Sequence, residues 1–277
     1  MRGEFVDLAG ARLYYYAAGS RGAGEPVVFL HGFGTSGRLW SDVVSLMPAG
    51  HRLVVVDLLG YGRSDPPGGR SLSVRAHGDR VIALLDALGI RDACVVGHGV
   101  GGGIAQSMAV EHAARVSRLA LVSSVAFGDW ATRDVRLARA AMPLLRHLPP
   151  AWLLSMVRSE MERGYVDSGR VAHALDKFGR PFTTPEGREA LREHILALDT
   201  RETREIAGRL REIRVPTSII WGSDDPYLPV ATGQRLAAAI AGASIDVVDG
   251  ARHFLPDDAP RQVADAIGRL LARPAAA

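Results

Sequence analysis

The sequence predicts an α/β fold with a doubly wound, mostly parallel sheet and an all-helical segment inserted into it. Short Val- and Leu-rich runs without alternation are typical of strands covered on both faces, and they occur at 26–30, 52–57, 93–97, 118–123, 217–221 and 244–248. Amphipathic helical patterns separate most of these runs, as in repeated β-α-β units. From about Phe127 to Arg214 the strand pattern stops and only helical patterns occur.

The elements can be assigned in order from the N-terminus. Residues 4–8 and 12–17 predict a hairpin that turns at Gly10. The first long amphipathic helix follows the buried run at 52–57. Gly89 can adopt the left-handed conformation that often ends a helix. Its apolar face carries Val81, Leu84, Leu85 and Leu88. The last helix has the same pattern at Val263, Ile267, Leu270 and Leu271.

The helical segment divides the chain into two parts. We expect a core of residues 1–126 and 215–277, and a helical cap of residues 127–214 broken at Pro149-Pro150, at Gly179-Arg180-Pro181 and at Thr184-Pro185. Open α/β sheets bind ligands at the carboxyl ends of their strands. The cap is therefore expected to form the roof of a ligand pocket at that edge.

Composition excludes several classes of protein. The 277 residues are 47% hydrophobic and carry a formal net charge of +3, enough apolar content for a large core. Arginines alternate with acids, as on solvated helix faces, so we expect no nucleic-acid partner. Cys94 is the single cysteine, and neither a signal peptide nor a long apolar stretch occurs, so we expect no membrane association and a cytoplasmic protein.

A glycine-rich turn follows the strand at 93–97. Gly97-His98-Gly99-Val100-Gly101-Gly102 has the strand-turn-helix context of a G-x-S-x-G nucleophile elbow, with Gly99 in place of the serine. The same glycines also satisfy the G-x-G-x-x-G phosphate-loop pattern. Against that alternative, no lysine follows the loop, and residues 121–124 include no acid that would hold a ribose.

Three further motifs lie after strands in a fixed order. His31-Gly32-Phe33-Gly34 follows the strand at 26–30, and the run 221–226 (WGSDDP) follows the next-to-last strand. The third, 250–254 (GARHF), lies after the last strand. The run 57–65 and His31 itself are interpreted as structural.

Together these four motifs resemble those of the α/β-hydrolase superfamily, particularly its capped, esterase- and epoxide-hydrolase-like members. The resemblance implies that backbone N–H groups of Phe33 and Val100 form an oxyanion hole and that Asp225 orients His253. Asp224 is the second candidate for the acid. Gly99 then occupies the nucleophile position.

No other residue replaces the missing nucleophile. Cys94 is expected to be buried in the strand, where an apolar thiol is inert. Ser107, Ser123 and Ser124 do not lie at the elbow. Members of this fold with an aspartate nucleophile resemble G-x-D-W, whereas Val100 is not a tryptophan, so the usual serine-ester mechanism cannot run on this chain.

Three functions remain open. The first is an enzyme that uses His253 and Asp225 as a base, on water or on a substrate proton, for slow hydrolysis, elimination, cyclisation or carbon–carbon cleavage. The second is an esterase- or lactonase-like serine hydrolase with an inactivating Ser-to-Gly change at Gly99. The third is a ligand-binding pseudoenzyme that keeps the capped pocket without turnover.

The expected ligand is a small, largely apolar carbonyl or ester compound, with no cofactor and no metal. Besides the catalytic positions, five residues are candidates for contacting it: Gly32, His98, Trp130, Met142 and Trp152. The last three belong to the helical segment, where apolar side chains also build the interior of the cap itself.

Overall fold

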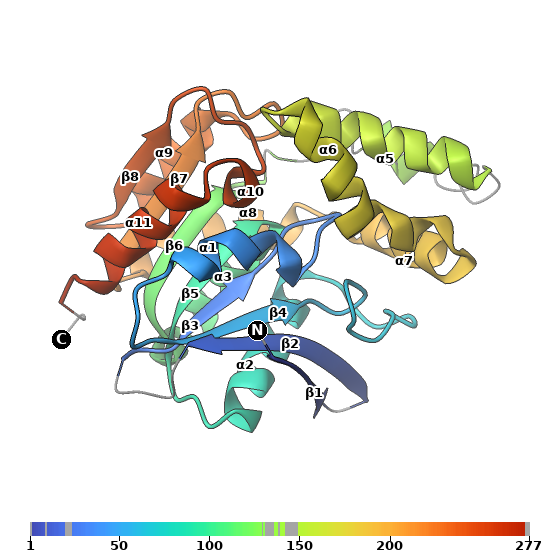
Figure 1. Ribbon diagram of the computed structural model, residues 1–277. Helices are drawn as coiled ribbons and strands as arrows, with labels where there is room; N and C mark the ends of the chain where they lie inside the picture. The colour runs from blue at the N-terminus through green and yellow to red at the C-terminus, as the bar shows by residue number, and fades with distance from the viewer. Residues whose placement is uncertain are drawn as a thin grey trace.

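The computed structural model describes residues 2–8, 10–19, 24–128, 130, 136–137, 139–141 and 149–274. An eight-stranded sheet forms its centre, with helices around it (Figure 1). The strands are β1 (Arg2–Leu8), β2 (Ala11–Gly19), β3 (Val27–Leu30), β4 (Arg52–Asp57), β5 (Ala93–Gly99), β6 (Val116–Ser124), β7 (Thr217–Gly222) and β8 (Ser244–Val248).

The helices of the core are α1 (Ser41–Leu46), α2 (Val74–Ala87), α3 (Val100–Glu111), α9 (Val230–Ala239), α10 (Leu255–Asp258) and α11 (Pro260–Leu271), with short turns η1 (Gly37–Trp40) and η2 (Ala113–Arg115). Gly89 has a φ of +64° just beyond α2, as expected for a left-handed residue at a helix end.

The sheet has the order β1-β2-β4-β3-β5-β6-β7-β8. β1 pairs with β2, and β2 with β4, in antiparallel register, whereas the other neighbours are parallel. The predicted N-terminal hairpin and the predicted mostly parallel, doubly wound α/β sheet are therefore confirmed.

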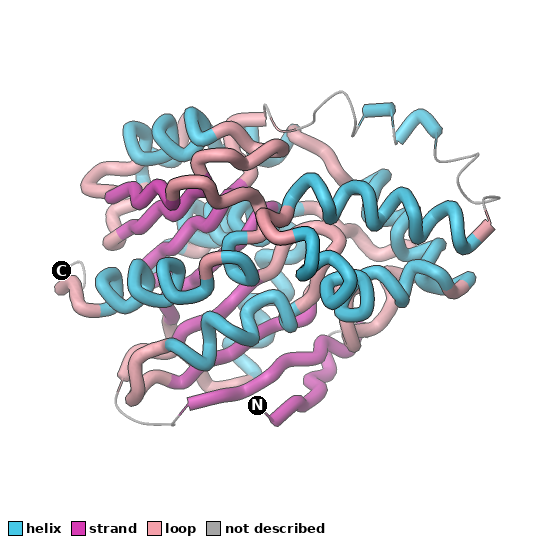
Figure 2. The backbone as a smooth tube through the Cα atoms, turned by 45° about the horizontal axis from the view of Figure 1, so that its top comes forward, coloured by secondary structure: helices cyan, strands magenta, loops and turns pink. Residues whose placement is uncertain are grey.

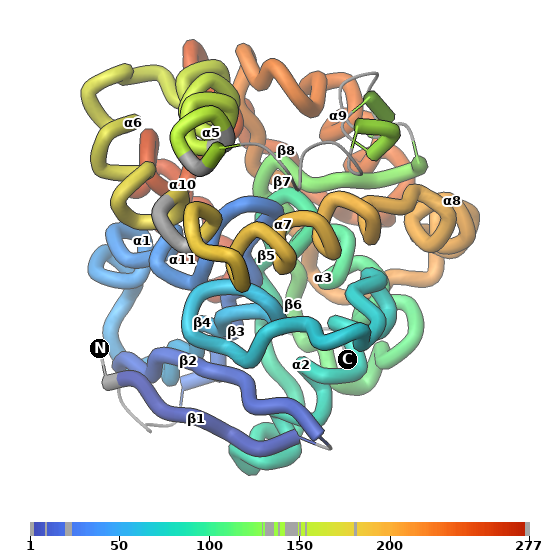
Figure 3. Tube along the Cα trace, turned by 90° about the vertical axis from the view of Figure 1, so that its right-hand side faces the viewer, coloured from blue at the N-terminus to red at the C-terminus, as the bar shows by residue number. Residues whose placement is uncertain are grey.

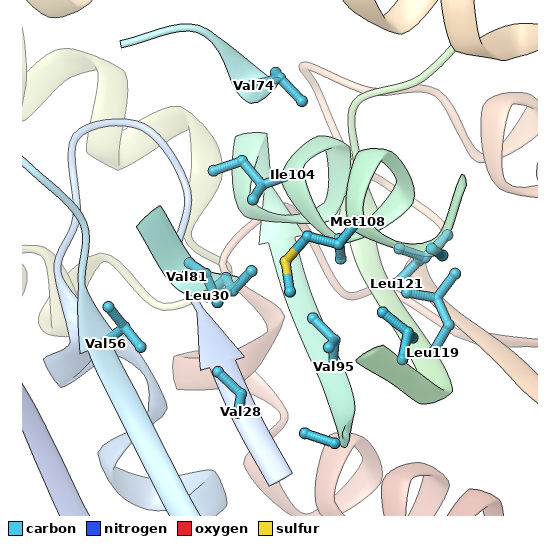
Figure 4. Close-up of a cluster of buried hydrophobic side chains, with 14 of the residues drawn as sticks. Val28, Leu30, Val56, Val74, Val81, Val95, Ile104, Met108, Leu119 and Leu121 are labelled. Carbon is cyan, nitrogen blue, oxygen red and sulfur yellow. The ribbon is translucent and has the colours of Figure 1, made fainter. Parts of the chain in front are cut away.

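Alternate residues of the buried strands pack against different helices. Val28 and Leu30 lie in a cluster with α2, α3 and α9, part of which is drawn in Figure 4. Val27 and Phe29 lie in a second cluster with α1 and α11. Figure 2 shows helices on both sides of the strands. Both faces of the sheet are covered, which explains the continuous apolar runs in the sequence.

The strand order reverses between β3 and β5. The chain continues from β3 to β4 on one side, and β5 returns to pair with β3 on the other side. Loops that leave neighbouring strands in opposite directions open a crevice at their carboxyl ends, the usual ligand site of open α/β sheets. Gly32 and Gly99 lie directly at this point.

The described residues between 127 and 214 form helices and short helical turns, and none of them joins the sheet. Figure 3 shows α5 and α6 at the upper left, with α7 passing in front of β5 and α8 at the right. The division into core and cap remains a prediction. The elements are α5 (Pro150–Gly164), α6 (Ser168–Ala174), η3 (Leu175–Gly179), η4 (Arg180–Thr183), α7 (Pro185–Ala197), α8 (Arg201–Ala207) and η5 (Leu210–Glu212).

Candidate active site

The turn between β5 and α3 is sharp. Gly99 has φ +53° and ψ −120°, a conformation that side chains disfavour. A Cβ atom on Gly97 would lie 2.3 Å from the carbonyl oxygen of Gly101, and one on Gly101 would lie 2.4 Å from that of Leu30. The two flanking glycines are therefore required for strand and helix to approach each other.

Residue 99 itself is not crowded. A Cβ atom there would lie 3.5 Å from the Cα of Gly32 and 3.7 Å from Nε2 of His253, which are ordinary contact distances. Only the positive φ opposes a side chain at this position. The turn therefore has the geometry expected of a nucleophile elbow, and a Cβ atom at residue 99 would lie near the histidine.

Asp225 and His253 meet across two loops at the carboxyl ends of β7 and β8. His253 Nδ1 donates a 2.8 Å hydrogen bond to Asp225 Oδ2. The other carboxylate oxygen accepts N–H bonds of 2.9 Å from Tyr227 and from Leu228. Asp224, the second candidate, instead accepts a hydrogen bond from the Ser223 hydroxyl. The structure thus brings Asp225, and not Asp224, to His253.

The surroundings of Asp225 favour its charged form. Burial raises the pKa of this carboxyl, but His253, its hydrogen bond and the two backbone amides outweigh that effect and hold the pKa below its ordinary value. An ionised Asp225 keeps the proton of His253 on Nδ1. The lone pair of Nε2 then faces residue 99, the arrangement that a general base needs.

The predicted oxyanion turn lies beside the elbow. Phe33 follows β3, Val100 is the first residue of α3, and both line the same cavity together with Gly32. N–H groups of the first helical turn have no partner within the helix, and the helix dipole favours negative charge there. His31 supports the turn, because Nδ1 donates to the Gly32 carbonyl at 2.9 Å and Nε2 accepts from the Leu58 amide at 3.1 Å.

The cavity beside this turn is narrow: about 20 Å³ is open to the centres of water-sized molecules, and the space of about 420 Å³ between its walls includes open solvent. Gly99 and His253 are not among its lining residues. The core supplies Gly32, Phe33, Leu58, Tyr61, Leu72, Val74, His77 and Val100. The helical segment supplies Trp130, His194, Ala197, Leu198 and Asp199.

The candidate contact residues differ in their positions. Gly32 and Trp130 line the cavity, and the indole Nε1 of Trp130 donates to Thr203. His98 does not: its ring is 1% exposed, and Nε2 donates to the backbone carbonyl of His253 at 3.0 Å, so it supports the histidine loop instead. Trp152 is 65% exposed on α5 and lines no part of this cavity. Met142 lies outside the described residues.

Sequence reasoning missed His77, His194 and Tyr61 as cavity residues. His194 stacks on Tyr61 with ring centroids 3.7 Å apart, and its Nε2 donates to the Gly60 carbonyl. For His77, the sequence pattern did contain an indication. It lies on the buried stripe of α2 between Val74 and Val81, where a polar residue in an apolar face indicates a special environment.

The helical segment also holds the histidine loop. The carbonyl of Gly164, at the end of α5, accepts the N–H of His253 at 3.1 Å and that of Phe254 at 3.3 Å. Just beyond, Asp257 accepts hydrogen bonds from Tyr165 at 2.7 Å and from Lys177 at 2.8 Å. The position of His253 therefore depends on the contact between α5, η3 and α10.

Two classes of site are not found among the residues that the structure describes. No group of three or more His, Cys, Asp or Glu side chains there could hold a metal ion. Within the same part of the chain, each helix is too short or too polar to span a bilayer.

Comparison with known proteins agrees with the fold. A model of the alpha/beta hydrolase family matches residues 27–266. A 2-hydroxy-6-oxononadienedioate/2-hydroxy-6-oxononatrienedioate hydrolase of Paraburkholderia xenovorans is 30% identical over 257 residues, which are 88% of this chain and 84% of the relative. The chain therefore belongs to the alpha/beta hydrolase family.

Solved structures give the same result. An alpha/beta hydrolase fold protein from Burkholderia ambifaria superposes with a TM-score of 0.85 at 26% identity, covering 96% of this chain and 99% of that one. Est816, described as an N-acyl homoserine lactone degrading enzyme, superposes with a TM-score of 0.73 at 28% identity, covering 95% and 98%. The family and its relatives named as hydrolases indicate a hydrolase-type protein.

Proposed function

We propose that the protein is an enzyme that acts on a small, largely apolar ester or other carbonyl compound, with His253 and Asp225 as a general base and without a serine nucleophile. The observation that carries the proposal is the acid–histidine pair, which is complete and points at residue 99. The names of the two relatives above, a hydrolase of an oxo-dioate and a lactone-degrading enzyme, support a carbonyl substrate.

The reaction on an ester follows from these positions. His253 Nε2 takes a proton from a water molecule beside Gly99, and the hydroxide attacks the carbonyl carbon. The N–H groups of Phe33 and Val100 stabilise the negative charge that develops on the carbonyl oxygen. When the intermediate collapses, the alcohol leaves with the proton from His253, and the acid remains. No covalent acyl-enzyme forms, because glycine has no side chain.

The first experiment removes the base. Replacing His253 by alanine should lower the hydrolysis of short activated esters by about 10²- to 10⁴-fold, the usual contribution of a positioned acid–base group. The matched control is His112→Ala, because His112 lies at the end of α3 and contacts the exposed Asp79. Equal rates of ester hydrolysis in the two variants would refute the role of His253 as the general base. Ligand binding without turnover in the unmodified protein would favour the ligand-binding pseudoenzyme.

A further inference from the structure

We propose that His77 is a substrate-binding residue that forms a hydrogen bond with an uncharged polar group at the far end of the substrate. This inference rests on the proposed function for the position of the reacting carbonyl, at the oxyanion turn. It adds the chemical class of the substrate: a carbonyl compound with a second, neutral hydroxyl, keto or amide group.

The first support is the course of the cavity. It begins at Phe33 and Val100, whose amides would hold the carbonyl oxygen, and it continues between α2 and the helical segment. A substrate held at the oxyanion turn would therefore extend one of its two substituents into this cavity. His77 is part of the wall that this substituent would meet.

The second support is the state of the His77 side chain. It is 4% exposed, and no hydrogen bond of its ring nitrogens is found among the residues that the structure describes, while His77 lines the cavity and its nitrogens are not among the fully buried unpartnered atoms. Buried polar groups without a partner are uncommon and destabilising. Because His77 lines the cavity, a bound ligand can supply the missing partner.

Three other polar side chains of the cavity wall are engaged within the protein. Nε2 of His194 donates to the Gly60 carbonyl at 3.0 Å, and the indole N–H of Trp130 donates to Thr203 at 2.9 Å. Asp199 is bonded to the amide and guanidinium of Arg201. His77 is therefore the side chain best able to recognise a polar ligand group.

The charge of the wall selects against anions. Burial, with smaller effects of Arg80, His194 and His31, lowers the pKa of His77 to about 3, so its ring is neutral at physiological pH. Asp199 is the one charged residue among those described in the cavity wall, and it is negative. Because Asp199 is bonded to Arg201, the described wall offers a carboxylate no free positive partner in exchange for its hydration, so we expect an uncharged ligand group.

The experiment measures binding of three matched ketones to the unmodified protein by NMR titration: 2-heptanone, 7-hydroxy-2-heptanone and the anion 6-oxoheptanoate. We expect the hydroxyketone to bind about 5- to 10-fold more tightly than the plain ketone and to shift the His77 ring signals. The anion should bind most weakly. Binding needs no turnover, so loss of the proposed catalysis would leave this result readable.

Substitutions at His77 test whether this side chain causes the preference for the hydroxyketone. His77→Phe should remove the advantage of the hydroxyketone, whereas His77→Gln, which retains donor and acceptor, should keep most of it. His112→Phe is the control for a histidine outside the cavity. A preference that survives His77→Phe, tightest binding of the anion, or no binding of any ketone would overturn the proposal, and the NMR spectrum of each variant reports whether it is folded.

Discussion

At the scale of single residues, the turn between β5 and α3 contains two kinds of glycine. Gly97 and Gly101 are required because a Cβ atom would collide with backbone oxygens, whereas Gly99 has room for a side chain. A G-x-S-x-G elbow presents a serine hydroxyl at this position, a group that Gly99 lacks. Restoring that group is therefore a meaningful experiment.

Gly99→Ser should create a serine hydrolase if the site is still arranged for acyl transfer. A Cβ atom at residue 99 would lie 3.7 Å from His253 Nε2, which places a hydroxyl within reach of the base. We expect hydrolysis of short activated esters with a burst of acyl-enzyme, and labelling of residue 99 by a phosphonate. Ester turnover no higher than in the unmodified protein would mean that the site serves other chemistry.

The same variant should be less stable by about 1 to 3 kcal/mol, because the side chain introduces strain at a positive φ. Gly97→Ser is the control: its Cβ atom would lie 2.3 Å from a backbone oxygen, so its loss should be larger or prevent folding. Urea unfolding of both proteins measures the difference. A Gly99→Ser protein as stable as the parent would show that the turn is unstrained.

At the scale of elements, the sequence located the strands well and their tertiary contacts poorly. The six buried runs became β3 to β8 with ends shifted by at most two residues, because strands covered on both faces require continuous apolar sequence. The contact of Lys177 with Asp257 joins positions 80 residues apart, and no local pattern indicates it. The Asp225–His253 pair was predicted through the resemblance of four ordered motifs to those of α/β hydrolases, and the two side chains are hydrogen-bonded.

The Lys177–Asp257 ion pair connects the helical segment to α10 beyond the histidine loop. Both side chains are less than a tenth exposed, and the Tyr165 hydroxyl completes the cluster. Removing one partner of a buried pair leaves an uncompensated charge. Lys177→Met should therefore lower the free energy of unfolding by about 3 to 5 kcal/mol.

Arg192→Met is the matched control for Lys177→Met. It breaks the Arg192–Glu189 pair on the surface of α7, where both side chains are at least a third exposed. Exposed pairs contribute about 0 to 1 kcal/mol. Comparable losses in the two variants, measured by urea unfolding, would show that the buried pair does not hold the helical segment in place.

At the scale of the whole molecule, the packing of the site leaves an unusual number of neutral histidines in the interior. His31, His77, His98 and His194 lie around the crevice, each no more than 4% exposed. Burial lowers their pKa values to about 4, 3, 3 and 4, respectively. These four histidines lie in the core, at the elbow and in the helical segment, so their protonation affects the stability of all three parts.

These histidines predict a protein that loses stability in mild acid. Below about pH 6.5 the unfolded chain protonates them and the folded chain does not, so each lowers the free energy of unfolding by roughly 1.4 kcal/mol per pH unit until the folded pKa is reached. Asp57 acts in the opposite direction, because burial raises its pKa to about 6 and the folded state then gains a proton first. Four histidines outweigh one carboxyl, so we expect a loss of roughly 6 kcal/mol between pH 7 and pH 5.

Urea unfolding at the two pH values tests this prediction, and His98→Gln provides the internal control. His98 Nε2 donates to the His253 carbonyl, and a glutamine amide can donate in its place while it cannot titrate. The variant should therefore show a weaker dependence on pH even where it is less stable at pH 7. Equal free energies of unfolding at pH 7 and pH 5 would mean that these rings take up protons in the folded state, and that the interior around the crevice admits water.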